Sequence, residues 1–189
     1  MEDCGVSGLY LLLVLGIWAG LTALIVKGWR RLLARDDVPK RRTHAVFVPL
    51  LACWLGVTFW YGGGRKVYYD AEVNRMCRED GGVKVYEQVK LPPEKFDKYG
   101  VVRIPSRQDA KPDDEYYYDN ETTYLQIGNP SLRRSHTRVV MRSNGKVLGE
   151  AISYHRVGGD LPGPWHPSSF ACPKPGDLGL EKGIFIRED

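Results

Sequence analysis

The sequence predicts an α+β protein in which two transmembrane helices precede a small domain made of a helix packed on an antiparallel β-sheet. Three observations lead to this prediction. Two long apolar stretches without charge lie in the first third of the 189 residues, a helical apolar stripe follows them, and two strand-like runs flank an Asn-Gly pair further on. We therefore expect a membrane hairpin over residues 1–64 and a folded domain over residues 65–189.

The two apolar stretches are long enough to cross a bilayer as helices. Residues 8–26 would form about 28 Å of helix and residues 45–61 about 25 Å, against a hydrocarbon thickness of about 30 Å. The acidic N-terminus and the long apolar core favour a retained span over a cleaved signal peptide. Residues 49–53, PLLAC, resemble a lipobox, so lipidation of Cys53 is the alternative for the second stretch, although the apolar run continues beyond this cysteine.

The connection between the two stretches, residues 27–44, predicts the orientation of the chain. It contains seven Lys or Arg and two Asp. Short loops that are rich in Lys and Arg stay in the cytoplasm. In a bacterium this places domain 65–189 in the periplasm and makes the chain a multi-pass inner-membrane protein. The formal net charge of +4 is set mainly by this loop, so it does not indicate binding to nucleic acid.

Small residues lie four apart in both apolar stretches and predict close packing of helices. They are Gly16 and Gly20 in the first stretch, and Ala52 and Gly56 in the second. Faces of this kind allow two helix backbones to approach each other. The two spans either pack on each other through these faces or present one of them to another copy or a partner. Neither stretch contains a charged residue or a histidine, which argues against a transporter or pump.

The folded domain is expected to begin with a helix and a strand. Residues 62–64, GGG, predict a flexible joint. Residues 68–80 predict a helix with one apolar face. That face is formed by Tyr69, Val73, Met76 and Cys77. Residues 83–91 alternate in polarity and are rich in β-branched side chains, which predicts a strand. The prolines at 92 and 93 then favour a short helical turn.

A β-hairpin is the clearest local prediction. Within residues 136–156, two strand-like runs flank Asn144-Gly145, a pair that suits a two-residue type I′ turn. Residues 115–127 predict another strand, and the GNPS turn joins it to the hairpin. The result is a meander of three antiparallel strands, with residues 83–91 as the expected fourth strand.

Two cysteines of the domain, Cys77 and Cys172, are expected to form a disulfide. Both would lie in an oxidising compartment, where such a pair is the simplest outcome. Cys172 belongs to a proline-rich strap over residues 162–176. Two aromatic residues of the strap are expected to cover apolar surface, namely Trp165 and Phe170.

The histidines predict no metal site, because the sequence has no CxxC, HxxxH or HExxH spacing. We expect no cofactor. Counting outward from the predicted turn places His136 opposite Ser153 and His155 opposite Arg134, so the two histidines would be diagonal neighbours rather than a pair.

An acidic segment, residues 109–121, contains six carboxylates and one lysine. It lacks the spacing of a calcium loop. Counting across the GNPS turn places Glu121 opposite Arg138, so cross-strand charge pairs with four arginines account for the segment. These arginines are Arg133, Arg134, Arg138 and Arg142. A candidate recognition patch for a basic partner combines Tyr116, Tyr117, Tyr118, Arg134 and Arg138.

Two segments carry a resemblance to other proteins. Residues 77–87, CREDGGVKVYE, and residues 166–173, HPSSFACP, resemble small proteobacterial inner-membrane proteins and lipoproteins to which no role is assigned. The resemblance covers mainly the domain. It implies a bacterial inner-membrane setting and no particular activity, and this chain departs from lipoproteins by carrying two spans.

The sequence contains no Gly-rich phosphate loop, nucleophile elbow or pair of catalytic carboxylates at a recognisable spacing. We therefore expect a membrane-anchored binding or assembly protein without catalytic activity. A subunit or a toxin-neutralising immunity factor of an envelope complex would fit, with a protein partner or a second copy beside the lipid bilayer. The alternative is a periplasmic hydrolase or lyase that uses His136, His155 or His166.

Overall fold

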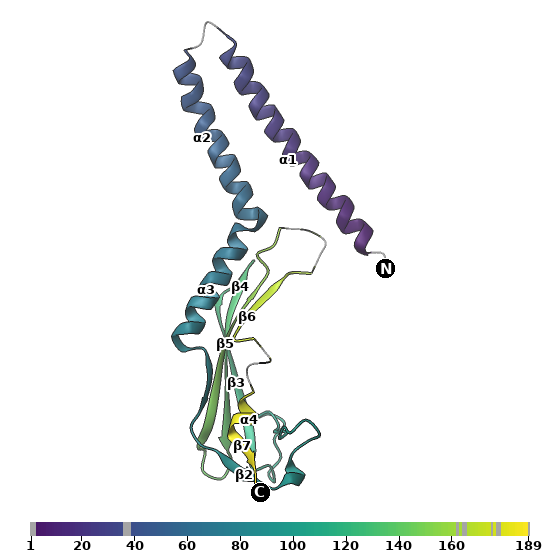
Figure 1. Ribbon diagram of the computed structural model, residues 1–189, viewed down its shortest axis with the longest axis vertical. Helices are drawn as coiled ribbons and strands as arrows, with labels where there is room; N and C mark the ends of the chain where they lie inside the picture. Colours follow the sequence, from purple (N-terminus) through teal and green to yellow (C-terminus); the bar gives the residue numbers. More distant parts are fainter. Residues whose placement is uncertain are drawn as a thin grey trace. The chain divides into compact units, whose positions relative to one another are not determined.

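The computed structural model describes residues 3–35, 39–161, 163, 166–174, 176 and 179–188. The chain is α+β, with two long apolar helices and a mainly antiparallel sheet (Figure 1). It divides into two compact units. One unit consists of Met1–Arg65 with Asp160–Pro167, and the other of Lys66–Gly159 with Ser168–Asp189.

The first unit contains helices α1 (Asp3–Leu33) and α2 (Lys40–Phe59). Both are long and apolar enough to cross a membrane. They continue beyond the expected spans, 8–26 and 45–61, into the basic connection. Lys, Arg and Leu in this connection are good helix formers, so the change from apolar to basic sequence does not end either helix.

Helices α1 and α2 are joined by a reciprocal pair of hydrogen bonds. The indole N–H of Trp18 donates to Oγ1 of Thr58 at 3.1 Å, and that of Trp54 donates to Oγ1 of Thr22 at 3.1 Å. Each threonine hydroxyl donates in turn to the carbonyl of the tryptophan four residues earlier in its own helix. Both helices therefore use the same short sequence, W-x-G-x-T, and use it in opposite directions.

The small residues expected to pack the helices lie outside this contact. A Cβ added to Gly16, Gly20 or Gly56 would meet no atom within 4 Å, and Ala52 is exposed. The structure thus pairs the two helices through tryptophan and threonine side chains instead of close backbones. The other interpretation, in which the small residues meet another copy or a partner, stays a prediction.

The segment after α2 is helical instead of the expected flexible joint. Residues Trp60–Gly64 form a π-helical turn, η1, and helix α3 (Arg65–Asp80) follows directly. Only Gly63 leaves the helical conformation, with a φ of 154° that favours glycine. The predicted apolar face of α3 is correct, because Val73 and Cys77 are buried.

The main sheet has five strands in the order β1-β5-β4-β3, and β6 also pairs with β5. The strands are β1 (Gly82–Val85), β3 (Tyr116–Gln126), β4 (Ser131–Met141), β5 (Val147–Val157) and β6 (Ser169–Cys172). All their pairings are antiparallel, and β3–β4–β5 is the predicted meander. Strands β1 and β6 share the remaining edge of β5, at residues 149–152 and 154–157 respectively.

The prediction of one strand over residues 83–91 is wrong. The chain leaves the main sheet after β1, where the N–H groups of Tyr86 and Glu87 both donate to the carbonyl of Leu148. Strand β2 (Val89–Leu91) instead pairs in parallel with β7 (Phe185–Arg187) in a second sheet. The predicted helical turn after it is present as the short 3₁₀ helix η2, Pro93–Lys95.

The turn between β4 and β5 is longer than predicted. Gly145 has a φ of 69°, but Asn144 has no positive φ, and the N–H of Met141 donates to the carbonyl of Lys146. The turn thus has four residues rather than the two of a type I′ turn. A bulge at Leu148 adds one residue to β5. Together these two features displace the register between β4 and β5 by one residue from the predicted register.

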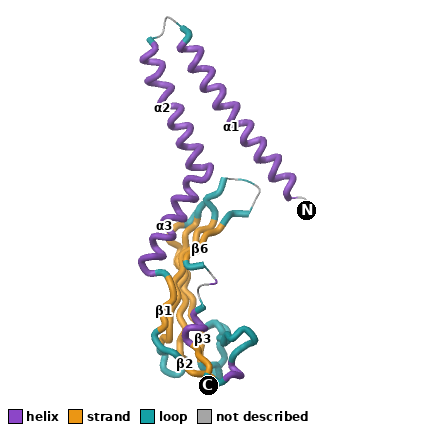
Figure 2. Tube along the Cα trace, viewed as in Figure 1, coloured by secondary structure: helices purple, strands orange, loops and turns teal. Residues whose placement is uncertain are grey.

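Two core clusters lie on opposite faces of the main sheet. Neighbouring side chains of β5 separate them, since Ile152 belongs to one cluster and Ala151 to the other. The first contains Val73, Cys77, Leu132, Ile152 and Tyr154. The second contains Leu91, Val102, Val139, Leu148, Ala151, Leu180, Ile184 and Phe185. Helix α3 packs in the first cluster and lies beside the strands in Figure 2, and the short helix α4 (Leu180–Ile184) packs in the second cluster.

The strap and α3 are joined at their cysteines. The sulfur atoms of Cys77 and Cys172 lie 2.08 Å apart, and their Cα atoms 5.9 Å apart, which matches the expected pairing. Part of the strap is a strand, β6, and Phe170 in it packs against the α3 cluster as expected. The predicted role of Trp165 falls outside the described residues.

Candidate functional site

The three histidines named as candidate catalytic groups do not meet. His136 pairs with Ile152 and His155 with Arg133, so the predicted opposite residues, Ser153 and Arg134, are each wrong by one position. This register places His136 and His155 on opposite faces of the sheet. His166 is exposed and belongs to the other unit.

His136 instead belongs to a cross-strand contact centred on Glu150. Its Nε2 lies 2.8 Å from one carboxylate oxygen, and the hydroxyl of Tyr86 donates to the other at 2.6 Å. The amine of Lys84 lies 3.5 Å from the same group. The Tyr86 hydrogen bond first, and His136 second, lower the pKa of Glu150, so this carboxylate stays ionised and is unsuited to donate a proton.

His155 is half-buried on the opposite face. Its Nε2 lies 2.9 Å from the hydroxyl oxygen of Ser153. Burial, and then the charge of Arg133, lower its pKa below 6.5. No carboxylate is among the groups that shift its pKa, so nothing in these contacts prepares it for acid–base chemistry.

Of the four arginines expected to pair with the acidic segment, Arg138 does so, in a different register from the predicted one. Arg138 lies opposite Asp119, with 3.1 Å between the charged groups, and Glu121 is a diagonal neighbour at 3.8 Å. A bulge at Leu125 accounts for part of this displacement. Arg134 instead forms an ion pair with Asp80 of α3, with 3.1 Å between the guanidinium nitrogen and the carboxylate oxygen.

The predicted tyrosine patch does not form one surface. Side chains alternate along β3, so Tyr116 and Tyr118 pack toward the cluster around Phe185, with ring centroids of Tyr116 and Phe185 5.1 Å apart. Tyr117 lies on the other face, where the guanidinium of Arg142 is 5.8 Å from its ring centroid. Arg134 and Arg138 are engaged by carboxylates, as described above.

The outer edge of β3, which has 11 residues, is the longest edge of the sheet that is open to a partner. At its start the edge is occupied by the chain itself, since Tyr118 donates to the carbonyl of Pro105 and accepts from the N–H of Arg107. Beyond Tyr118, no further backbone hydrogen bond is made on this edge by the residues that the structure describes. All residues from 120 to 125 are exposed.

The backbone groups that remain open on this edge can be assigned. Strand geometry has a period of two, so the residues that share the direction of the Tyr118 N–H and C=O are Asn120, Thr122 and Tyr124. The intervening residues hydrogen-bond to β4. Three N–H and three C=O groups therefore point away from the sheet in one row.

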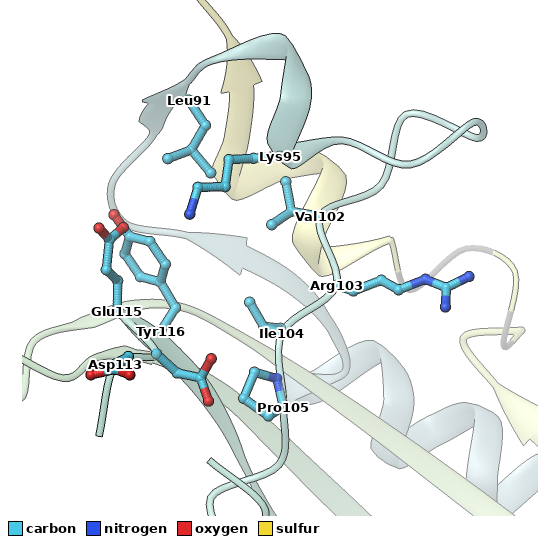
Figure 3. A pocket seen from close by; sticks show the side chains of 10 residues that line it. Leu91, Lys95, Val102, Arg103, Ile104, Pro105, Asp113, Glu115 and Tyr116 are labelled. Carbon is cyan, nitrogen blue, oxygen red and sulfur yellow. The ribbon is translucent and has the colours of Figure 1, made fainter. Parts of the chain in front are cut away.

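Two cavities lie near the start of β3, and Figure 3 shows the first of them. The first, of about 100 Å³, has an apolar floor that includes Leu91 and Ile104; Lys95 reaches over it and Arg103 points away. It is smaller than the range of about 300–1,000 Å³ usual for ligand sites. The second, of about 490 Å³, is lined by residues 112–116 and 141–143. Neither is lined by a histidine or a cysteine.

Sequence reasoning missed the buried ion pair of Arg156 and Asp70. The Arg156 side chain is 1% exposed, and its Nε lies 2.5 Å from the Asp70 carboxylate. The same guanidinium donates to the carbonyls of Gly158 and Ser168. It thereby joins α3, β5 and the residue that leads into β6. Because side chains alternate along β5, Arg156 shares a face with Ile152 and Tyr154. This alternation was the signal in the sequence that could have predicted a buried arginine.

Among the residues that the structure describes, no group of three or more His, Cys, Asp or Glu could hold a metal ion. The arrangement instead offers an open strand edge beside acidic side chains. Comparisons with protein-family models, with curated proteins and with solved structures found no match to this chain.

Proposed function

We propose that this chain is a two-span protein of the bacterial inner membrane whose periplasmic domain binds an extended, basic segment of a partner protein, without catalysing a reaction. The two long apolar helices support the anchoring, and the basic connection between them supports the orientation. Binding of this kind would suit a subunit or an immunity-type factor of an envelope complex.

The open outer edge of β3 is the observation that carries the proposal. An unpaired edge presents its N–H and C=O groups to any extended chain, which can add to the sheet as a further strand. Folded proteins usually protect such an edge with Lys, Pro or a bulge. Between Tyr118 and Tyr124, β3 contains no Lys, Arg or Pro, and its bulge comes only at Leu125.

The acidic side chains along this strand specify the chemistry of the partner. Strand β3 contains no basic residue. Asp119 is engaged by Arg138 and Arg107, whereas the side chain of Glu121 is 65% exposed. The preceding segment adds Asp113 and Glu115, which line the cavity of about 490 Å³ at the start of the strand. A segment rich in Lys or Arg is therefore electrostatically complementary to the edge.

A proline at position 122 tests the proposal, because the N–H of Thr122 points away from β4. Thr122→Pro removes one outward donor and blocks strand addition while the β3–β4 hydrogen bonds remain. Thr122→Val keeps the donor and the β-branched shape and is the matched control. A photo-activated cross-linker at Thr123, an exposed neighbour in β3, reports the contact in the full chain in intact cells.

We expect a cross-linked adduct with a second protein in the Thr122→Val chain and its loss in the Thr122→Pro chain, at an equal unfolding midpoint. Equal adduct yields in the two variants would contradict strand addition. An adduct of twice the mass of the chain would identify a second copy and contradict a basic partner. Separately, a phosphatase fused to the C-terminus should be active, and an inactive fusion would contradict the orientation.

The histidine-dependent hydrolase or lyase is not proposed as a second function. His136 and His155 lie on opposite faces of the sheet, and neither lines the cavities near β3. A catalytic set would need these groups within hydrogen-bonding reach of one substrate position.

A further inference from the structure

The tip between β3 and β4, residues 124–130, exposes an unusual amount of apolar surface. Tyr124 is 59% exposed, Leu125 47% and Ile127 87%. Single exposed apolar residues are normal on a folded protein. Three within four consecutive positions, none of them in either core cluster, form a projecting apolar tip that the fold of this domain does not use.

The tip lies at the end of the domain where the chain enters it. A Cβ placed on Gly159 would lie 3.5 Å from Cβ of Pro130 and 3.6 Å from Cα of Lys66, so the tip and the first turn of α3 meet at this glycine. The side chain of Asn129 also accepts a hydrogen bond from the N–H of Gly159 at 2.6 Å. Lys66 follows the end of α2, Phe59, by seven residues of the chain.

The charges near the tip suit a phospholipid surface. No carboxylate occurs between Thr122 and Arg134. Arg133 is exposed and lies directly opposite Tyr124 across the two strands. Tyrosine beside aliphatic side chains, with an arginine next to them, is the composition that favours the boundary between headgroups and acyl chains.

We propose that the β3–β4 tip inserts Leu125 and Ile127 into the headgroup boundary of the bilayer that α1 and α2 cross, with Arg133 at the lipid phosphates. This inference rests on the membrane-spanning part of the proposed function. The domain would then be held at the membrane at two points, the chain connection at Lys66 and the tip, and the outer edge of β3 would lie close to the membrane surface.

The test places a polarity-sensitive fluorophore at Ile127→Cys in the full chain, in a Cys4→Ser and Cys53→Ser background that leaves the Cys77–Cys172 pair intact. Tyr99→Cys is the matched control, because Tyr99 is a comparably exposed loop residue, at 68%. The chain is placed in nanodiscs of phosphatidylethanolamine and phosphatidylglycerol, one chain per disc. Iodide in the buffer and a nitroxide on the lipid headgroup serve as quenchers.

We expect the fluorophore at 127 to be quenched several-fold more by the lipid nitroxide, and several-fold less by iodide, than the fluorophore at 99. Equal access of iodide to both positions overturns the inference. Protection at 127 that appears only with several chains per disc also overturns it, because the tip would then contact a second copy. Extraction of the chain from membranes by alkaline carbonate would contradict the membrane anchoring itself, whereas a carbonate-resistant chain with an iodide-accessible tip contradicts this inference alone.

Discussion

Tyr154 donates a hydrogen bond of 2.6 Å to Asp80 and so joins the central strand β5 to the last residue of α3. Arg134 of the neighbouring strand donates to the same carboxylate at 3.1 Å. The Tyr154 hydrogen bond is the main cause that lowers the pKa of Asp80, while burial and the Asp80 contact raise the pKa of Tyr154. The orientation of α3 on the sheet thus depends on a polar contact at the end of an apolar face.

Replacing Tyr154 with phenylalanine should lower the free energy of unfolding by about 1–2 kcal/mol. The change removes a mostly buried hydroxyl and leaves the Asp80 carboxylate without this hydrogen-bond donor. Chemical denaturation of the full chain in detergent measures the change. Tyr86→Phe, which removes an exposed hydroxyl from Glu150, is the control and should change the free energy by less. Equal effects would mean that the Asp80 contact does not hold α3.

Replacing Arg156 with methionine should destabilise the domain by about 3–5 kcal/mol, because the Asp70 carboxylate and two carbonyls would lose a buried partner. Arg75→Met provides the comparison. Arg75 also forms ion pairs, with Glu72 and Glu79, but these lie on the surface, where such pairs contribute little to stability. Thermal unfolding of both variants tests the difference, and similar midpoints would contradict a structural role for Arg156.

Opening the Cys77–Cys172 bridge should destabilise the domain without changing its fold. The bridge closes a loop with a sequence separation of 95, worth about 4–5 kcal/mol if it acts on the entropy of the unfolded chain. Four backbone pairs between β5 and β6 still hold the strap when the bond is open. A Cys77→Ser, Cys172→Ser chain should therefore keep its circular dichroism spectrum and unfold at lower denaturant concentration. A changed spectrum would show that the bridge is needed for the native fold.

Acidification should weaken the domain partly through His155. Its folded pKa lies below 6.5, so the unfolded chain takes up this proton first, and the free energy of unfolding falls as the pH drops through about 6.5 toward the folded value. His155→Gln should reduce this fall between about pH 7.5 and 5.5. If the free energy of unfolding of the His155→Gln variant fell with pH as steeply as that of the original chain, the contribution assigned to His155 would be contradicted.

The contact between α1 and α2 can be tested by cross-linking. In a Cys4→Ser and Cys53→Ser background, Trp18→Cys with Thr58→Cys should form an intramolecular bridge with a short bifunctional thiol reagent, because the two side chains face each other and the reagent replaces the reach of the indole. Gly20→Cys with Gly56→Cys is the control, since a Cβ at either glycine meets nothing within 4 Å. An intramolecular bridge in the control pair alone would mean that the small residues pack the helices.

Local patterns were enough to predict several elements of this fold. The apolar spacing of Tyr69, Val73 and Cys77 predicted α3, and the runs around the Asn-Gly pair predicted β4 and β5. The registers were wrong because the turn after β4 has four residues instead of two and because one-residue bulges occur at Leu125 and Leu148. None of these features changes the alternation that defines a strand.

Features that depend on distant segments could not be predicted from periodicity. The parallel pairing of Val89–Leu91 with Phe185–Arg187 joins two ends of the domain. Whether an edge of β3 is open depends on the order of the strands in the sheet, and the periodicity of one sequence does not give that order. The W-x-G-x-T repeat was visible in the sequence, but its glycines suggested a backbone contact, whereas the tryptophan and threonine on either side of each glycine make the contact.

This repeat has a consequence for how the hairpin enters a membrane. The pair of tryptophan–threonine hydrogen bonds is symmetric, because each helix donates one indole N–H to the other and accepts one at its threonine hydroxyl. Such a contact stabilises the hairpin equally whether its loop faces inward or outward, and it carries no information about sidedness. In the proposed membrane setting, the seven Lys and Arg of the connection would then orient the hairpin.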